Sequence, residues 1–252
     1  MKWVKRVKLM QFSKIAIVIC VILSTVLAGF TVYGEKVGSF VIDTQEDSSL
    51  IKIALSEYED LSNQTDRLAV KGLTNQRDTT LGDIPFDITK GAGTKTDAEF
   101  RRYIAHSFYV INNSEIDVEL MFNLDITAID KDVDSAVRVM LIFGEEQSGT
   151  VYAKWQEERE TDEEGNPTGP WADKLVNGER VPETDPAAGA KFDGKTKMFV
   201  SESRVLSETL GGLGAGKAVK VTVVVWLEGW DAQCVDDLYG GAIRMAMNIK
   251  GY

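Results

Sequence analysis

The chain has 252 residues, of which 44% are hydrophobic, enough for one sizeable domain with its own core in addition to a targeting segment. Its net charge is −11, and because the first fourteen residues carry +5 with no acid, the rest of the chain carries −16. So acidic a body repels phosphate backbones, which argues against nucleic acid as a partner. The two cysteines, Cys20 and Cys234, are too few for a disulfide scaffold.

The N-terminal segment is basic up to Lys14 and then contains no charge from Ile15 to Tyr33. These nineteen residues suffice for a helix across about 30 Å of hydrocarbon, and they also fit a long secretory signal. Val26 and Ala28 are small or medium-sized residues at the −3 and −1 positions of a signal-peptidase cut before Gly29. We therefore predict that residues 1–34 are a signal peptide or a membrane anchor. Both interpretations place the remainder of the chain outside the cell, with the membrane contacted through Ile15–Tyr33 before any cleavage.

Short strands are predicted to follow this leader. The first is Gly38–Asp43 (GSFVID), and the next two lie at residues 49–56 and 68–73, where apolar side chains alternate with others. Residues 74–97 are rich in Gly, Thr and Asp, so we expect a long surface loop, with one anchored point at residues 84–86 (Ile-Pro-Phe).

The strand candidate Gly38–Asp43 allows two arrangements. Cleavage near Gly29 would leave it in a free N-terminal arm. The arm either pairs inside its own sandwich or adds to an open sheet edge of a neighbouring copy, where unpaired N–H and C=O groups are available. The second arrangement repeats head to tail without closing, so self-assembly through Gly38–Asp43 would build filaments.

The middle of the chain carries the next clear strand signals. Two alternating runs over residues 101–126 flank a polar turn at Asn112–Ser114, which predicts a hairpin. Residues 136–143 and 150–155 are further strand candidates. Residues 156–193 hold six acids in one cluster and four of the five prolines, but too few apolar residues for a core of their own. We interpret them as a polar, acidic insertion between core strands.

The closing stretch, Lys217–Tyr252, contains two strongly alternating strands joined by an acidic loop. In the first strand, apolar residues alternate with a mixed set that includes Lys220, Thr222 and Trp226. Because successive side chains point to opposite faces, we expect one face to pack on a core and the other to meet water. Many short strands, Gly-rich turns and almost no helical periodicity predict an all-β fold for residues 35–252. The architecture that they favour is a jelly-roll-like β-sandwich.

Several segments carry a resemblance to a known family. They are FVIDT, IALSEYEDLSNQTDRLAV, DIPFDI, YIAHSFYVINNSEIDVEL, VDSAVRVMLIFG and WLEGWDAQCVDDLYGGAIRMAMNI. Together they resemble the TasA/camelysin-like exported proteins of Gram-positive bacteria, whose leader is cut by a specialised signal peptidase. The resemblance spans most of the chain outside residues 156–193. It implies a jelly-roll domain, export to the cell surface or biofilm matrix and, for TasA-like members, fibres built by strand exchange.

An enzymatic role has little support in the residues. Camelysin-like proteins are classed as metallopeptidases, but a hydrolytic zinc site needs several His and carboxylate ligands, and this chain has one histidine, His106, and no H-E-x-x-H. A serine mechanism would depend on the same imidazole, and no G-x-S-x-G motif is present. We therefore predict no catalytic residues, and we expect His106 to be a packed or rim side chain on the face of Ile104 and Phe108.

Calcium is the better metal candidate. Hard cations take oxygen ligands, and Glu228, Asp231, Asp236 and Asp237 lie in one short loop. The same acids would also suit a solvated turn, and both interpretations stay open.

The function that these observations favour is an exported structural or adhesive protein of the cell surface or extracellular matrix, with a fibre subunit as its most specific form. One alternative is a metal-dependent surface peptidase of the camelysin kind. Another is a carbohydrate- or host-binding module, in which Trp171, Trp226 and Trp230 would form the platform.

Overall fold

A computed structural model describes residues 39–46, 50–72, 76–97, 99–145, 149–154, 174–176, 179–181, 196–229, 231 and 233–252. These residues belong to one unit, Gly38–Tyr252. The predicted leader, residues 1–34, lies outside them. Within the described ranges, no helix combines the length and the apolar character that crossing a membrane requires.

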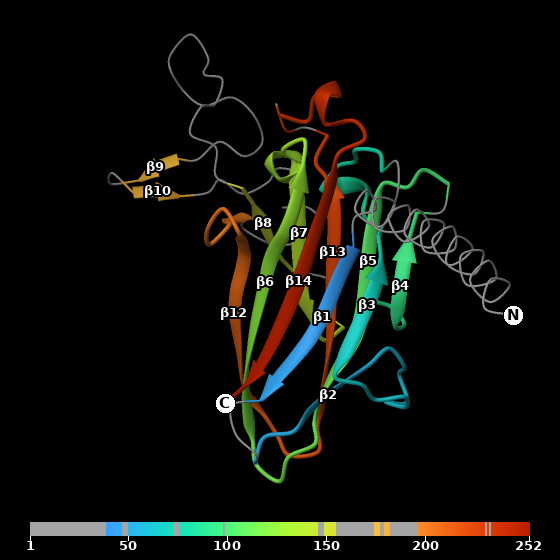
Figure 1. The fold of residues 1–252 in the computed structure, drawn as a ribbon, viewed down its shortest axis with the longest axis vertical. Helices are drawn as coiled ribbons and strands as arrows, with labels where there is room; N and C mark the ends of the chain where they lie inside the picture. Colours follow the sequence, from blue (N-terminus) through green and yellow to red (C-terminus); the bar gives the residue numbers. More distant parts are fainter. Residues whose placement is uncertain are drawn as a thin grey trace, which may run out of the picture. The chain divides into compact units, whose positions relative to one another are not determined.

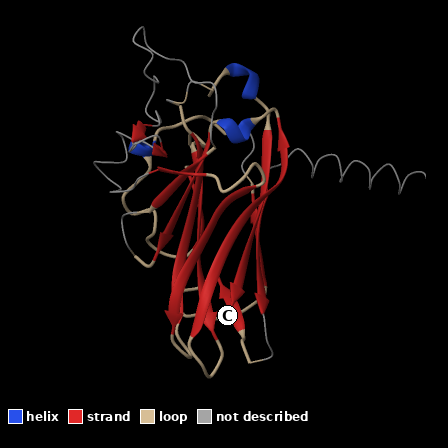
Figure 2. Ribbon diagram, turned by 90° about the vertical axis from the view of Figure 1, so that its left-hand side faces the viewer, coloured by secondary structure: helices blue, strands red, loops and turns tan. Residues whose placement is uncertain are grey.

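Two mixed β-sheets pack face to face as a sandwich (Figures 1 and 2). The all-β sandwich predicted from the strand patterns is thereby confirmed. The first sheet has the order β12 (Arg204–Leu213), β6 (Val118–Asp130), β14 (Ala242–Gly251), β1 (Ser39–Glu46) and β3 (Arg67–Lys71). The second sheet has the order β11 (Thr196–Met198), β8 (Thr150–Ala153), β7 (Val137–Phe143), β13 (Ala218–Leu227), β5 (Tyr103–Asn112) and β2 (Ile53–Ser56), with β4 (Gly93–Thr96) also paired to β5.

Smaller elements complete the described chain. Three 3-10 helices, η1 (Leu81–Asp83), η2 (Val133–Ser135) and η3 (Asp236–Leu238), lie at the same end of the sandwich (Figures 1 and 2). Strands β9 (Lys174–Val176) and β10 (Glu179–Val181) pair with each other in an antiparallel ribbon. This ribbon is the part of the predicted 156–193 insertion that the structure describes.

The main core lies between the two sheets. Every second side chain of β13 points into this main core, and Val221, Val223 and Val225 pack there as predicted. They meet the inward side chains of β14, among them Met247 and Ile249.

The opposite face of β13 is buried as well, which corrects the expectation that this mixed face meets water. Thr222 and Trp226 are fully buried and Lys220 is only 5% exposed. The reason is a second core, in which Leu81, Ile84 and Ile88 from the segment around η1 pack on the outer face of this sheet. Residues 81–88 of the predicted loop therefore form a cover segment, which these buried side chains anchor to the sheet.

Two further details of that loop differ from expectation. Phe86, expected to anchor the loop together with its two predecessors, is 45% exposed. Residues 93–96, placed in the loop by the sequence, form strand β4.

Strand β1 lies in the interior of the first sheet. It runs parallel to β14, from Phe40 opposite Met245 to Glu46 opposite Gly251, and antiparallel to β3. Phe40 and Ile42 point into the main core. Within one chain, the predicted arm thus completes its own sandwich.

The register of β13 generates a stability prediction. Val223→Asp would place an unpaired carboxylate between the sheets and should cost several kcal/mol, a large part of the stability of an ordinary domain. Thr209→Asp, on the exposed side of β12, is the matched control and should cost under about 1 kcal/mol. Urea unfolding of both variants measures the difference, and similar losses at the two positions would contradict the register.

Candidate functional site

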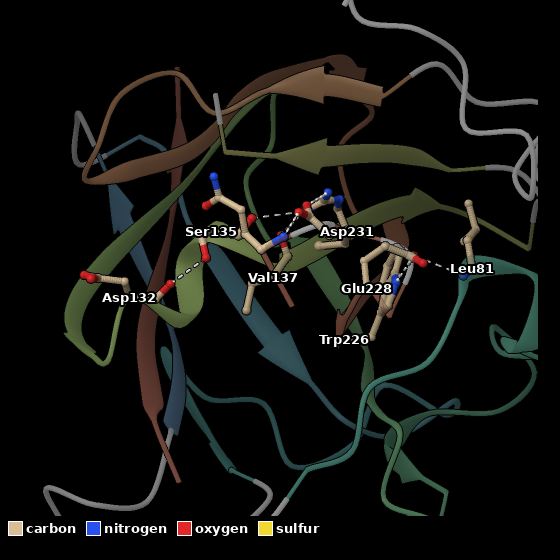
Figure 3. A network of polar contacts seen from close by, with 9 residues as sticks. Leu81, Asp132, Ser135, Val137, Trp226, Glu228 and Asp231 are labelled. Carbon is tan, nitrogen blue, oxygen red and sulfur yellow. Dashed lines mark hydrogen bonds and ion pairs between the residues drawn. The ribbon is translucent and has the colours of Figure 1, made fainter. Parts of the chain in front are cut away.

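The acidic loop after β13 packs against the helical end of the sandwich. Glu228 is buried, and its Oε2 accepts hydrogen bonds from the Trp226 indole Nε1–H at 2.9 Å and from the Leu81 backbone N–H at 3.3 Å (Figure 3). The backbone N–H of Gly229 donates to the carbonyl of Thr79 at 2.8 Å. These contacts join the loop to the cover segment around η1.

Asp231 takes part in a second buried contact. Its Oδ2 pairs with the guanidinium of Arg138 on β7, and its Oδ1 accepts the backbone N–H of Gln233 at 2.8 Å. Arg138 also donates to the carbonyl of Val137 at 3.0 Å. Both charged side chains are almost fully removed from water, so their mutual attraction offsets part of the cost of burying two charges.

The four predicted calcium ligands are divided by this arrangement. Glu228 and Asp231 face protein partners in the interior, while Asp236 and Asp237 are exposed on η3. Among the residues that the structure describes, no group of three or more His, Cys, Asp or Glu side chains is placed to hold a metal ion. Calcium binding by these residues stays a prediction.

The tryptophans proposed as a sugar platform are also placed differently. Trp226 is fully buried, so it cannot present a face to a ligand. Trp171 and Trp230 lie outside the described residues.

A second polar site surrounds His106, on the edge of the second sheet. Strands β2 and β4 pair one after the other along the same side of β5, and His106 lies directly opposite Thr94. The Thr94 Oγ1 is 3.0 Å from His106 Nδ1, and the Glu57 Oε1 is 3.3 Å from His106 Nε2. The contact with Glu57 is close but lacks the alignment of a hydrogen bond.

The imidazole is held and kept neutral by its surroundings. His106 is 1% exposed and stacks on Phe108 with ring centroids 5.7 Å apart. Burial lowers the pKa of His106 from 6.5 to about 4. The packed histidine predicted from the sequence is confirmed. Glu57 and Thr94 were missed, because no motif relates them to His106: Glu57 follows the strand predicted at residues 49–56, and Thr94 lies in the loop predicted at residues 74–97.

Comparison with known proteins does not assign this chain to a family. No family model matches the chain, and no curated protein matches it. A β-glucosidase from Kluyveromyces marxianus in complex with glucose is 10% identical with a TM-score of 0.22, and the match covers 77% of this chain and 16% of that one. AvmM, which catalyses macrocyclization in alchivemycin A biosynthesis, is 12% identical with a TM-score of 0.19, covering 60% of this chain and 80% of that one. Similarities this low carry no argument about fold or function.

The buried pair Arg138–Asp231 generates a stability prediction. Asp231→Leu should destabilise the protein by about 3–5 kcal/mol, because it leaves a buried guanidinium without its carboxylate. The double variant Arg138→Met/Asp231→Leu removes both charges and should recover most of that loss. Chemical unfolding of the single and double variants tests this. A double variant no more stable than Asp231→Leu alone would show that the pair is not what the single change disrupts.

The environment of His106 predicts how stability depends on pH. The unfolded imidazole titrates near its ordinary pKa of 6.5 and the folded one near 4, so the unfolded state binds more protons between these values. The contribution to stability is complete above about pH 6.5 and falls by about 3 kcal/mol as the pH drops toward about 4.

The measurement is urea unfolding across this window for the wild type and for His106→Gln. Carboxylates titrate in both proteins and cancel in the comparison, so the variant should lose less stability on acidification. Equal losses would mean that His106 is not protected from protonation.

Proposed function

We propose that the chain is an exported structural protein of the cell surface or extracellular matrix, a jelly-roll sandwich whose copies assemble into fibres by exchanging strand β1. It acts through assembly and adhesion and not through enzymatic turnover. The observation that carries the proposal is the position of β1, the first strand of the described chain, in the interior of the first sheet.

The slot that β1 occupies is specific for this strand. Its two neighbours, β14 and β3, supply backbone partners on both sides, and the core supplies pockets for Phe40 and Ile42. A one-residue shift would turn both apolar side chains toward the outer face, so the register is strongly fixed. Another copy of β1 would fit the same slot with the same contacts, which is the condition for strand exchange.

Exchange of this kind produces an open chain of subunits. Each copy would donate β1 to one neighbour and accept β1 from another, and a head-to-tail contact without closure extends into a filament. Export supports the same proposal. The basic and then uncharged segment up to Tyr33 has the pattern of a leader, and the acidic remainder suits an extracellular protein that must stay soluble before it assembles.

A cross-strand disulfide tests the exchange. Val41 of β1 and Ala69 of β3 are directly opposite each other on the outer face, with the backbone separation that a disulfide accepts in paired strands. We expect Val41→Cys/Ala69→Cys, with Cys20 and Cys234 replaced by Ser, to remain dispersed when oxidised as a monomer, because β1 is then tied to its own subunit. Oxidation after assembly should instead link neighbouring subunits into a covalent ladder on non-reducing gels.

The matched control places the disulfide between two strands that are not exchanged. Asn248 and Asn123 are directly opposite on β14 and β6, and the corresponding cysteine pair should give monomers on the gel and normal filaments in electron micrographs. Normal filaments from the locked Val41/Ala69 variant, or assembled material that runs as monomers, would rule out exchange of β1.

A further inference from the structure

Two side chains far apart in the sequence meet the two nitrogens of the single histidine. We propose that Thr94 is a reactive hydroxyl that accepts an acyl group from an activated ester, with His106 as its general base and Glu57 as a positioning residue. The inference is independent of strand exchange, since it concerns the edge of the other sheet.

The sheet geometry delivers the hydroxyl to the imidazole. Thr94 and His106 are a directly opposed pair on β4 and β5, so their side chains share one face. The two side chains differ in exposure: Thr94 is exposed at the sheet edge, whereas His106 is buried. The hydroxyl thus belongs to a residue that solvent reaches, while the imidazole beside it is shielded from water.

The arrangement of protons follows from the two contacts. A neutral imidazole carries one N–H, and the Glu57 carboxylate facing Nε2 at 3.3 Å favours the tautomer with the hydrogen on that atom. In that tautomer Nδ1 has a lone pair that can accept the hydroxyl hydrogen of Thr94, whose oxygen lies 3.0 Å away. The hydroxyl, the imidazole and the carboxylate thus lie in the order that hydroxyl activation requires, with Glu57 close to Nε2 but not aligned as a hydrogen-bond acceptor.

Burial affects the ring in two opposing ways. The lowered pKa of His106 keeps the ring neutral at neutral pH, with a lone pair to accept a proton, but it also weakens the ring as a base. The Glu57 carboxylate, 3.3 Å from Nε2, offsets this loss because it stabilises the imidazolium that forms when the proton moves. The stacked Phe108 ring fixes the plane of the imidazole, which holds Nδ1 on the Thr94 oxygen.

The step conserves atoms and charge. Thr94 Oγ1 forms a bond to the carbonyl carbon of the ester as its proton moves to His106 Nδ1. The bond from that carbon to the leaving oxygen then breaks, and the leaving alcohol or phenol takes the proton back from His106. The products are an acyl ester on Thr94 and the free alcohol, with the imidazole neutral again.

Neighbouring hydroxyls lack one of these features. Thr96 is exposed two residues further along β4, but it lies opposite Ile104 and has no imidazole beside it. Ser107 and Thr222 are hydrogen-bonded to each other at 2.9 Å and are fully buried. Thr96 is therefore the natural control for Thr94.

The test uses p-nitrophenyl acetate with the full chain and locates the acetyl group by peptide mass spectrometry, because lysines also react. Acetyl should appear on Thr94, remain or increase in Thr94→Ser, disappear in Thr94→Ala and be unchanged in Thr96→Ala. Glu57→Gln removes the carboxylate charge from a side chain that is 39% exposed, so it should slow labelling of Thr94 without lowering the melting temperature.

The base is tested by His106→Gln, read only on protein whose circular dichroism matches the wild type. General base assistance is typically worth about 100-fold or more, so labelling of Thr94 should fall by about that factor. If this variant does not fold, Glu57→Gln supplies the same test. Labelling of Thr94 that is no faster than labelling of Thr96, or that is unaffected by Glu57→Gln, would overturn the proposal.

Discussion

Burial of strand β13 on both of its faces is the constraint on which much of the structure depends. Its inner valines meet the first sheet, and its outer face lies under the cover segment around η1. That outer face is not apolar, since it includes Lys220 and Thr222. Polar groups removed from water destabilise a fold unless they find partners, so the cover is stable only where such partners are supplied.

Two polar side chains on the outer face of β13 have such partners. The Lys220 ammonium lies 2.6 Å from the carboxylate of Glu145, and Thr222 shares a hydrogen bond with Ser107. Glu228 accepts from the Trp226 indole and so connects the outer face of β13 to the cover. In the acidic loop after β13, Glu228 and Asp231 therefore serve as partners for buried groups, while Asp236 and Asp237 face solvent.

The alternation of apolar and polar residues in the sequence predicted which side chains of a strand face the core. Alternation in β13 and β5 correctly assigned their inward side chains, because one face of each strand is more uniformly apolar than the other. It could not reveal that Lys220 is buried, since a lysine on a mixed face gives the same pattern whether its ammonium meets water or the carboxylate of Glu145. Nor could it relate Glu57 and Thr94 to His106, because their proximity results from β2 and β4 both pairing with β5.

The position of β1 could not be predicted either, and its topology bears on assembly. Neither neighbour of β1 is joined to it by a hairpin: β14 is the last strand of the described chain, and β3 is reached only after β2 in the other sheet. Strand β1 is thus held by pairing and by its core side chains. In the proposed exchange the same contacts would be remade in a second copy, so the closed and exchanged forms would have nearly equal enthalpies. The balance between them would then depend on the chain between β1 and β2 and on protein concentration, and it could allow a subunit to be stored as a monomer and still polymerise.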